Sequence, residues 1–200
     1  MNEASTTILE LVRQKGILRS RELSALGLSR VTLTRLLSAG LLQRLNRGLY
    51  VLPDKELTEY SSIAEIAIKN PKAIFCLLSA LQLHGVTTQN PNQVWIALDN
   101  KARPPKSSYP PLKVIRFSGN ALEVGVEKMV VDGAVNISVT NLEKTIVDCF
   151  KFRNKIGLDI AIEALQEGWR TKRVTMDGLW KFAQICRVSN VMRPYLESLS

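Results

Sequence analysis

The pattern of apolar and polar positions in the N-terminal part of the chain predicts three short helices. In residues 7–15 the apolar side chains follow the i, i+3, i+4 spacing of an amphipathic helix, and Thr7 and Glu10 have the spacing of a capping box. A second helix is predicted to begin with an N-cap at Ser20 and to end at the next glycine, with both of its leucines buried. A third helix, residues 30–39, follows almost at once. Helices joined by such a short, glycine-containing turn have the layout of a helix-turn-helix motif.

A β-hairpin is predicted directly after the third helix. Residues 41–45 and 49–52 have the composition of two strands, and the three-residue loop between them ends in Gly48, where a positive φ is usual. Pro53 ends the second strand, because proline has no N–H to donate to a sheet. A helix-turn-helix motif followed by a basic hairpin predicts a winged helix.

After this hairpin the pattern becomes a mixture of strands and helices. The expected helices cover residues 61–70, 79–85, 141–152, 158–169, 176–187 and 191–199, and the expected strands cover residues 73–78, 94–98, 112–117 and 129–139, the last with a turn at Asp132-Gly133. N-caps are expected at Ser61 or Ser62, at Ser79 and at Thr140. The predicted fold class is therefore α+β, with a winged helix-turn-helix domain at residues 1–53, a linker at 54–61 and a larger mixed α+β domain at 62–200 that has a helical C-terminal end.

The net charge of the chain indicates which class of partner it binds. The chain carries 27 basic and 18 acidic side chains, a formal net charge of +9, and residues 1–52 alone carry eight basic and three acidic ones. Such a surface favours nucleic acid or an anionic membrane as a partner. The N-terminus lacks the basic and apolar regions of a signal peptide, and no apolar run approaches the roughly 20 residues of a membrane span. We therefore expect a cytoplasmic protein with no membrane partner.

The third predicted helix carries the side chains best suited to contact DNA. At about 100° per residue, Leu33, Leu36 and Leu37 form one apolar stripe, so polar and cationic residues face outward. Arginine bonds guanine bidentately, serine and threonine bond either kind of base edge, and valine contacts a thymine methyl group. Arginines of the hairpin are placed to contact phosphate. We predict that double-stranded DNA is bound by Arg21, Arg30, Val31, Thr32, Thr34, Arg35, Ser38, Arg44 and Arg47.

Other interpretations of these residues stay open at this point. The N-terminal helices can also form a purely structural cap whose arginines are only solvated. Glu65, Asp99 and Lys101 can be fitted to a metal-dependent nuclease, although their spacing is not diagnostic. Cys76 lies in an apolar run, where an inert, buried thiol is usual, and His84 is expected to find its hydrogen bonds locally at a helix end.

The sequence contains no pattern for a cofactor or a metal. Its three cysteines are far apart, and one histidine is too few for a recognisable zinc site. There is no P-loop, no dinucleotide-binding glycine motif and no H-E-x-x-H. We expect no cofactor, no bound metal and no catalytic residues.

Three stretches in a fixed order resemble the AbiEi-type antitoxins of type IV toxin–antitoxin systems. They are LLQRLNRGLYVL in the predicted wing, CLLSALQLHGV in the middle, and SVTNLEKTIVDCF before the helical end. The resemblance implies a winged-helix autorepressor that binds repeated sites in its own promoter. It also implies a C-terminal domain that opposes a nucleotidyltransferase-type toxin without the need for a stable complex.

Two further functions are kept beside this resemblance. The first is a stand-alone winged-helix transcription factor with a ligand-sensing C-terminal domain, and the second is the metal-dependent nuclease mentioned above. Three residues also match the AbiEi-type pattern, namely Ser79, Thr145 and Asp148. They do not decide between these functions, because helix capping and core packing explain them equally well.

Overall fold

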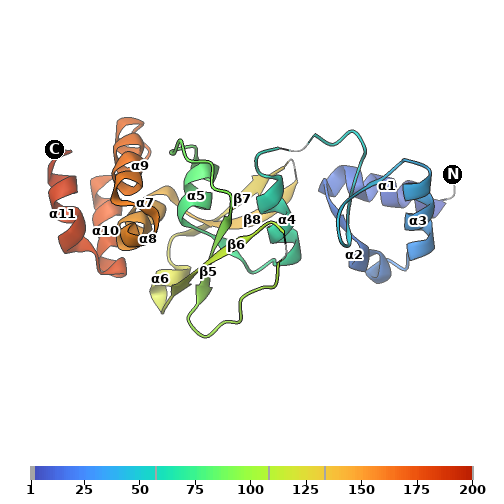
Figure 1. Cartoon of the computed structure of the whole chain (residues 1–200), viewed down its shortest axis with the longest axis horizontal. Coiled ribbons are helices and arrows are strands. Elements are labelled where there is room, and N and C mark those ends of the chain that lie inside the picture. Colours follow the sequence, from blue (N-terminus) through green and yellow to red (C-terminus); the bar gives the residue numbers. More distant parts are fainter. Residues whose placement is uncertain (1–2, 57, 108, 133, 200) are drawn as a thin grey trace. The chain divides into compact units, whose positions relative to one another are not determined.

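The computed structural model describes all residues except 1–2, 57, 108, 133 and 200, and the chain divides into two compact units. The N-terminal unit comprises Met1–Pro71 and Val130–Asn136, and the C-terminal unit comprises Lys72–Met129 and Ile137–Ser200 (Figure 1). Helices and two sheets make up the structure, which confirms the predicted α+β class. None of the helices in the described ranges is long and apolar enough to cross a bilayer.

The N-terminal unit contains the three helices and the hairpin that the sequence predicts. Its elements are α1 (Glu3–Lys15), β1 (Leu18–Arg19), α2 (Ser20–Ala25), α3 (Arg30–Ser38), β2 (Gln43–Asn46), β3 (Leu49–Val51) and α4 (Ser61–Lys69). The short strand β1 pairs antiparallel with β3 and gives the sheet order β1-β3-β2. This third strand is absent from the sequence prediction, because two residues are too few for a periodic signal.

Apolar side chains from α1, α2, α3 and the sheet region form one core in this unit. Its buried members are Ile8, Leu9, Val12, Leu18, Leu23, Leu33, Leu36 and Leu42. Each fully buried leucine or isoleucine contributes about 1.5–3 kcal/mol relative to an exposed one. The core therefore determines which face of α3 points inward.

Two boundaries in this unit differ from the prediction. α1 begins at Glu3, so Thr7 lies inside the helix, and its hydroxyl donates to the Glu3 carbonyl at 3.0 Å instead of capping the helix. In the hairpin, Asn46 pairs with Leu49, which shortens the expected three-residue loop to two residues. Gly48 has the expected positive φ, +74°.

The start and the packing of α2 also differ from the prediction. Ser20 is the first helical residue rather than the N-cap. The Glu22 carboxylate accepts the Arg19 N–H at 3.1 Å and satisfies that donor at the start of the helix. Leu26 was expected in the core but is 52% exposed, because it lies in the turn that follows the helix.

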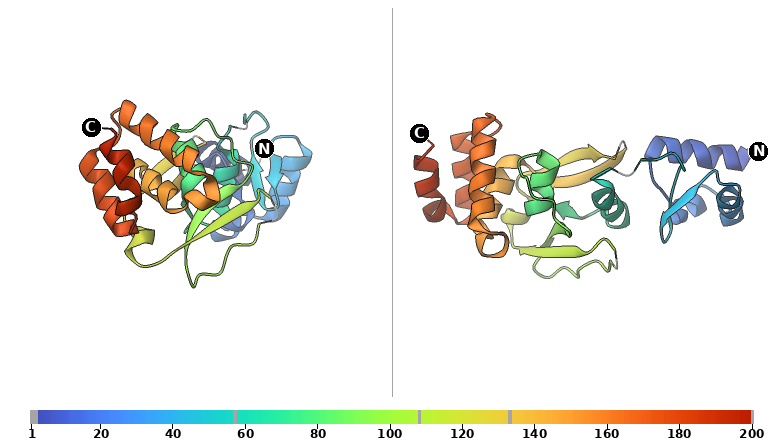
Figure 2. Two further views of the ribbon diagram at one scale, coloured as in Figure 1. Left: turned by 60° about the vertical axis from the view of Figure 1, so that its left-hand side comes forward. Right: turned by 45° about the horizontal axis from the view of Figure 1, so that its top comes forward.

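The C-terminal unit packs helices beside a mixed sheet. Its elements are β4 (Ile74–Phe75), α5 (Leu77–His84), β5 (Val94–Asp99), β6 (Leu112–Phe117), α6 (Asn120–Glu123), β7 (Val126–Val131), β8 (Val135–Thr140), α7 (Leu142–Lys151), α8 (Arg153–Ile156), α9 (Leu158–Arg170), α10 (Met176–Cys186) and α11 (Ser189–Glu197), with β7 and β8 extending into the N-terminal unit. The strand order is β6-β5-β4-β8-β7, with β4 antiparallel to β5 but parallel to β8, and β5 parallel to β6. The orange and red helices α9, α10 and α11 form the predicted helical end (Figure 2).

The apolar run at residues 73–78 is shared between a strand and a helix. β4 ends at Phe75 and α5 begins at Leu77, so the expected strand is shorter than predicted. Ser79 lies inside α5 and does not cap it. Its hydroxyl oxygen instead accepts the N–H of Trp95 at 2.9 Å, which links α5 to β5.

The expected serine and threonine caps of α4 and α7 are also absent. α4 has Tyr60 at its N-cap, with no side-chain cap hydrogen bond. α7 is capped by Asn141, whose side-chain oxygen accepts the N–H of Lys144 at 2.9 Å. Thr140 cannot take this role, because its hydroxyl is 2.7 Å from the hydroxyl of Thr145 in the interior.

Candidate nucleic-acid interface

The orientation of α3 is set by its N-terminal end and its buried face. Ser29 caps the helix by accepting the N–H of Val31 on its hydroxyl oxygen at 3.1 Å. The turn before it is closed by the Leu28 N–H, which donates to the Leu23 carbonyl at 2.8 Å. Leu33 and Leu36 are buried in the core. The opposite side of the helix must therefore face outward.

This outward side carries most of the residues that the sequence predicts to read bases. We call Arg30, Val31, Thr34, Arg35 and Ser38 the recognition face, and all five are exposed. Val31 is 57% exposed, which is unusual for a valine in a folded domain. No acidic residue occurs on α3, so nothing on this helix repels phosphate. The arrangement presents hydroxyl, guanidinium and methyl groups together on one short helix.

Thr32 departs from the prediction. It is only 6% exposed and lies on the inward side of α3. Residues four apart share one face of a helix, so Thr32 is placed with the buried Leu36. The expectation that Thr32 flanks the outward face is therefore wrong, and we leave it out of the interface.

The hairpin β2–β3 and helix α2 supply the other predicted cations. Arg21, Arg44 and Arg47 are all exposed. None of these three forms an ion pair with the residues that the structure describes. Arg44 Nε donates only to the backbone carbonyl of Asn46, at 3.4 Å. Their charges are thus available for phosphate.

One residue of the wing is missed by the sequence analysis. Asn46 accepts the N–H of Arg47 on its side-chain oxygen at 2.7 Å, and its Nδ2 donates to the carboxylate of Glu65 on α4. Asparagine is typical of turns, where its side chain bonds to nearby backbone, so the residue type could have indicated this contact with Arg47. Its partner Glu65 offered no such signal, because it lies nineteen positions further along the chain.

The residues considered for a metal-dependent nuclease have other contacts. Glu65 is 5% exposed and forms an ion pair with Lys69. The Asp99 carboxylate accepts the N–H of Lys101 at 2.8 Å, a contact within one loop. Among the described residues, no group of three or more His, Cys, Asp or Glu side chains is placed to hold a metal ion.

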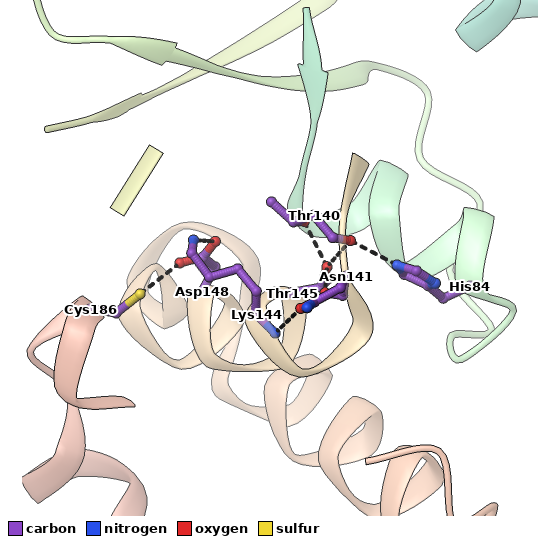
Figure 3. A network of polar contacts seen from close by, with 7 residues as sticks. All are labelled: His84, Thr140, Asn141, Lys144, Thr145, Asp148 and Cys186. Atoms are coloured by element: carbon purple, nitrogen blue, oxygen red, sulfur yellow. Dashed lines mark hydrogen bonds and ion pairs between the residues drawn. The ribbon is translucent and has the colours of Figure 1, made fainter. Parts of the chain in front are cut away.

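His84 and Cys76 do not form a catalytic pair in an open site. His84 Nε2 lies 2.8 Å from the carbonyl oxygen of Thr140, so its partner is distant in sequence and the expectation of a local one is wrong (Figure 3). Burial lowers the pKa of His84, which favours its neutral form. Cys76 is fully buried, and burial raises the pKa of its thiol well above the ordinary value, as expected for an inert cysteine.

The interior of the C-terminal unit contains a charged pair on α7. Lys144 and Asp148 form an ion pair with both side chains fully buried, and the Cys186 thiol donates to the second oxygen of Asp148 at 3.4 Å (Figure 3). Burial raises the pKa of Asp148, and the neighbouring Lys144 opposes that shift. Thr145 Oγ1 lies 2.9 Å from the carbonyl oxygen of Thr140. These buried residues link α7 to neighbouring elements, and their polar groups are bonded to one another rather than exposed to a ligand.

The N-terminal unit thus has the architecture of a winged-helix transcriptional regulator with a basic outward face. Residues 7–53 match the family described as "Transcriptional regulator, AbiEi antitoxin", so the resemblance seen in the sequence is confirmed for this segment. The fold of the chain is similar to the crystal structure of the RV2827C protein from Mycobacterium tuberculosis, with a TM-score of 0.54 and 14% identity over 100% of this chain and 81% of that one. No curated protein matches the sequence.

Proposed function

We propose that the protein is a cytoplasmic, sequence-specific, double-stranded DNA-binding repressor of its own promoter and an antitoxin, with no catalytic activity of its own. The observation that carries the proposal is the recognition face, exposed and free of acidic residues, beside a wing whose arginines form no ion pair with a described residue. The match of this segment to AbiEi antitoxin regulators supports it. Repeated sites in the promoter are the expected target.

The side chains of the interface divide into two roles. We assign Arg35, Thr34 and Ser38 to base edges in the major groove, and Val31 to a thymine methyl group. Arg21, Arg44 and Arg47 are assigned to phosphate, which gives position but no sequence information, while Arg30 at the start of α3 can serve either role. Affinity and specificity therefore depend on different residues.

Binding is expected to depend steeply on salt. If about five phosphates are neutralised, the logarithm of the binding constant falls against the logarithm of salt concentration with a slope of about −4 to −5. Fluorescence anisotropy with a labelled duplex from the promoter upstream of the gene measures this slope. The double variant R44A/R47A is the control, and its slope is expected to be shallower by about two. Binding that is indifferent to salt would contradict the proposal.

The antitoxic role is proposed for residues 62–200, with a nucleotidyltransferase-type toxin as functional partner. We expect such a gene next to this one. The test expresses that toxin from an unrelated inducible promoter, so that repression cannot protect the cell. Full-length R35A, impaired in DNA binding, is expected to rescue growth as well as the wild type does. Failure of both proteins to rescue, while the wild type still binds the promoter, would favour a stand-alone transcription factor.

A further inference from the structure

The side chain of Asn46 connects the wing to α4. Both ends of the Asn46 amide are occupied: Oδ1 accepts the Arg47 N–H at 2.7 Å, and Nδ2 donates to the Glu65 carboxylate. The pairing of β2 with β3 is irregular between Arg44 and Asn46, so the strand ladder alone does not hold this end of the hairpin. The turn that follows contains only Arg47 and Gly48. The two hydrogen bonds of the Asn46 side chain therefore help to hold this end of the hairpin where the strand pairing is irregular.

The other end of this connection is a buried, ion-paired carboxylate. Glu65 is 5% exposed, and its charge is balanced by Lys69, one turn later on α4, with Nζ 2.5 Å from Oε1. Ile63 and Ile66 of the same helix are buried. The guanidinium of Arg19 on β1 also donates to the carbonyl of Ile68 on α4. α4 is thus held against the winged helix at two points, one at β1 and one at β2.

We propose that Glu65 is a positioning residue for the wing and acts through Asn46 to orient Arg47 toward phosphate. The inference rests on the proposed DNA-binding function and concerns how its interface is held. The backbone of a two-residue turn containing glycine has many conformations, and ordering the turn that carries Arg47 on binding lowers affinity. A buried carboxylate that holds the neighbouring Asn46 reduces this cost before DNA arrives. The acidic residue considered for a nuclease is in this way assigned to DNA binding.

A double-mutant cycle in the full-length protein tests the proposal. We compare wild type, E65A, R47A and E65A/R47A by their affinity and salt slope on the promoter duplex. E65A is expected to weaken binding about 3- to 10-fold and to flatten the slope by about 0.9, as R47A does, because both lose the same phosphate contact. The double variant is expected to bind like R47A alone. Wild-type affinity in E65A, or losses that simply add, would overturn the inference.

Further variants separate positioning from general stability. E65Q keeps an acceptor for Asn46 and is expected to bind within about twofold of wild type. N46A leaves the Glu65–Lys69 ion pair intact and is expected to reproduce the loss seen in E65A, which keeps the test valid if E65A unfolds. E56A removes an exposed acid from the chain segment before α4 and is expected to show no loss of DNA affinity. If the wild type itself fails to bind the duplex, the proposed function is overturned rather than this inference alone.

Discussion

Replacing Lys144 by alanine is expected to lower the free energy of unfolding of the C-terminal unit by about 3–5 kcal/mol. Lys144 and Asp148 are both fully buried and are paired with each other. The ammonium group also lies 4.7 Å from the centre of the Phe117 ring. Removal of the lysine leaves a carboxylate in the interior with no countercharge, and this penalty is larger than the strength of the pair itself.

Urea unfolding followed by tryptophan fluorescence measures this loss selectively. Trp95, Trp169 and Trp180 all lie in the C-terminal unit. K151A is the matched control, because Lys151 is on the same helix, is half-buried and forms no ion pair with a described residue. K144M/D148L, which removes both charges, is expected to recover most of the stability. Equal stability of K144A and K151A would show that the pair has no such role.

Replacing Arg35 by alanine is expected to cost about 1–3 kcal/mol of binding free energy and to relax the base preference at one position of the site. Arg35 is exposed near the middle of α3, on the side opposite the buried Leu33 and Leu36. A bidentate contact to guanine disappears with the side chain, whereas the phosphate contacts made by the wing remain. The loss is therefore expected on the preferred sequence and not on random DNA.

Competition binding on a set of single-base variants of the promoter site tests this expectation. R47A is the comparison, since loss of a phosphate contact is expected to weaken every sequence alike. T32S is a further control, because Thr32 lies on the inward side of α3. If R35A and R47A both bound the promoter as the wild type does, α3 and the wing would be the wrong surface.

The N-terminal unit shows where sequence patterns are reliable. The leucine spacing of α3 predicts its buried and exposed sides correctly for Val31, Thr34, Arg35 and Ser38, because the period of a helix is fixed by its backbone geometry. The prediction for Thr32 is wrong because this polar residue lies at the edge of the apolar stripe, where its position on the helix buries it. The N-cap predictions at Ser79 and Thr140 are wrong, because both hydroxyls form hydrogen bonds with partners in the folded core.

Contacts between distant segments are the part that the sequence leaves undetermined. His84 and Thr140 are separated by 56 positions, and Cys186 and Asp148 by 38. Nothing in local spacing predicts such pairs, because chain topology alone brings the segments together. The same is true of β1, a strand of two residues that exists only through its pairing with β3.

By itself, the sequence determined the hairpin, the α+β class, the basic recognition face and the helices other than the four-residue α6 and α8, because amphipathic period, glycine turns and charge are local properties. Only the tertiary structure decided that Glu65 reaches the wing through Asn46 and that Lys144 and Asp148 are buried as a pair. Burial and long-range contacts depend on how elements pack, and packing is a property of the whole fold.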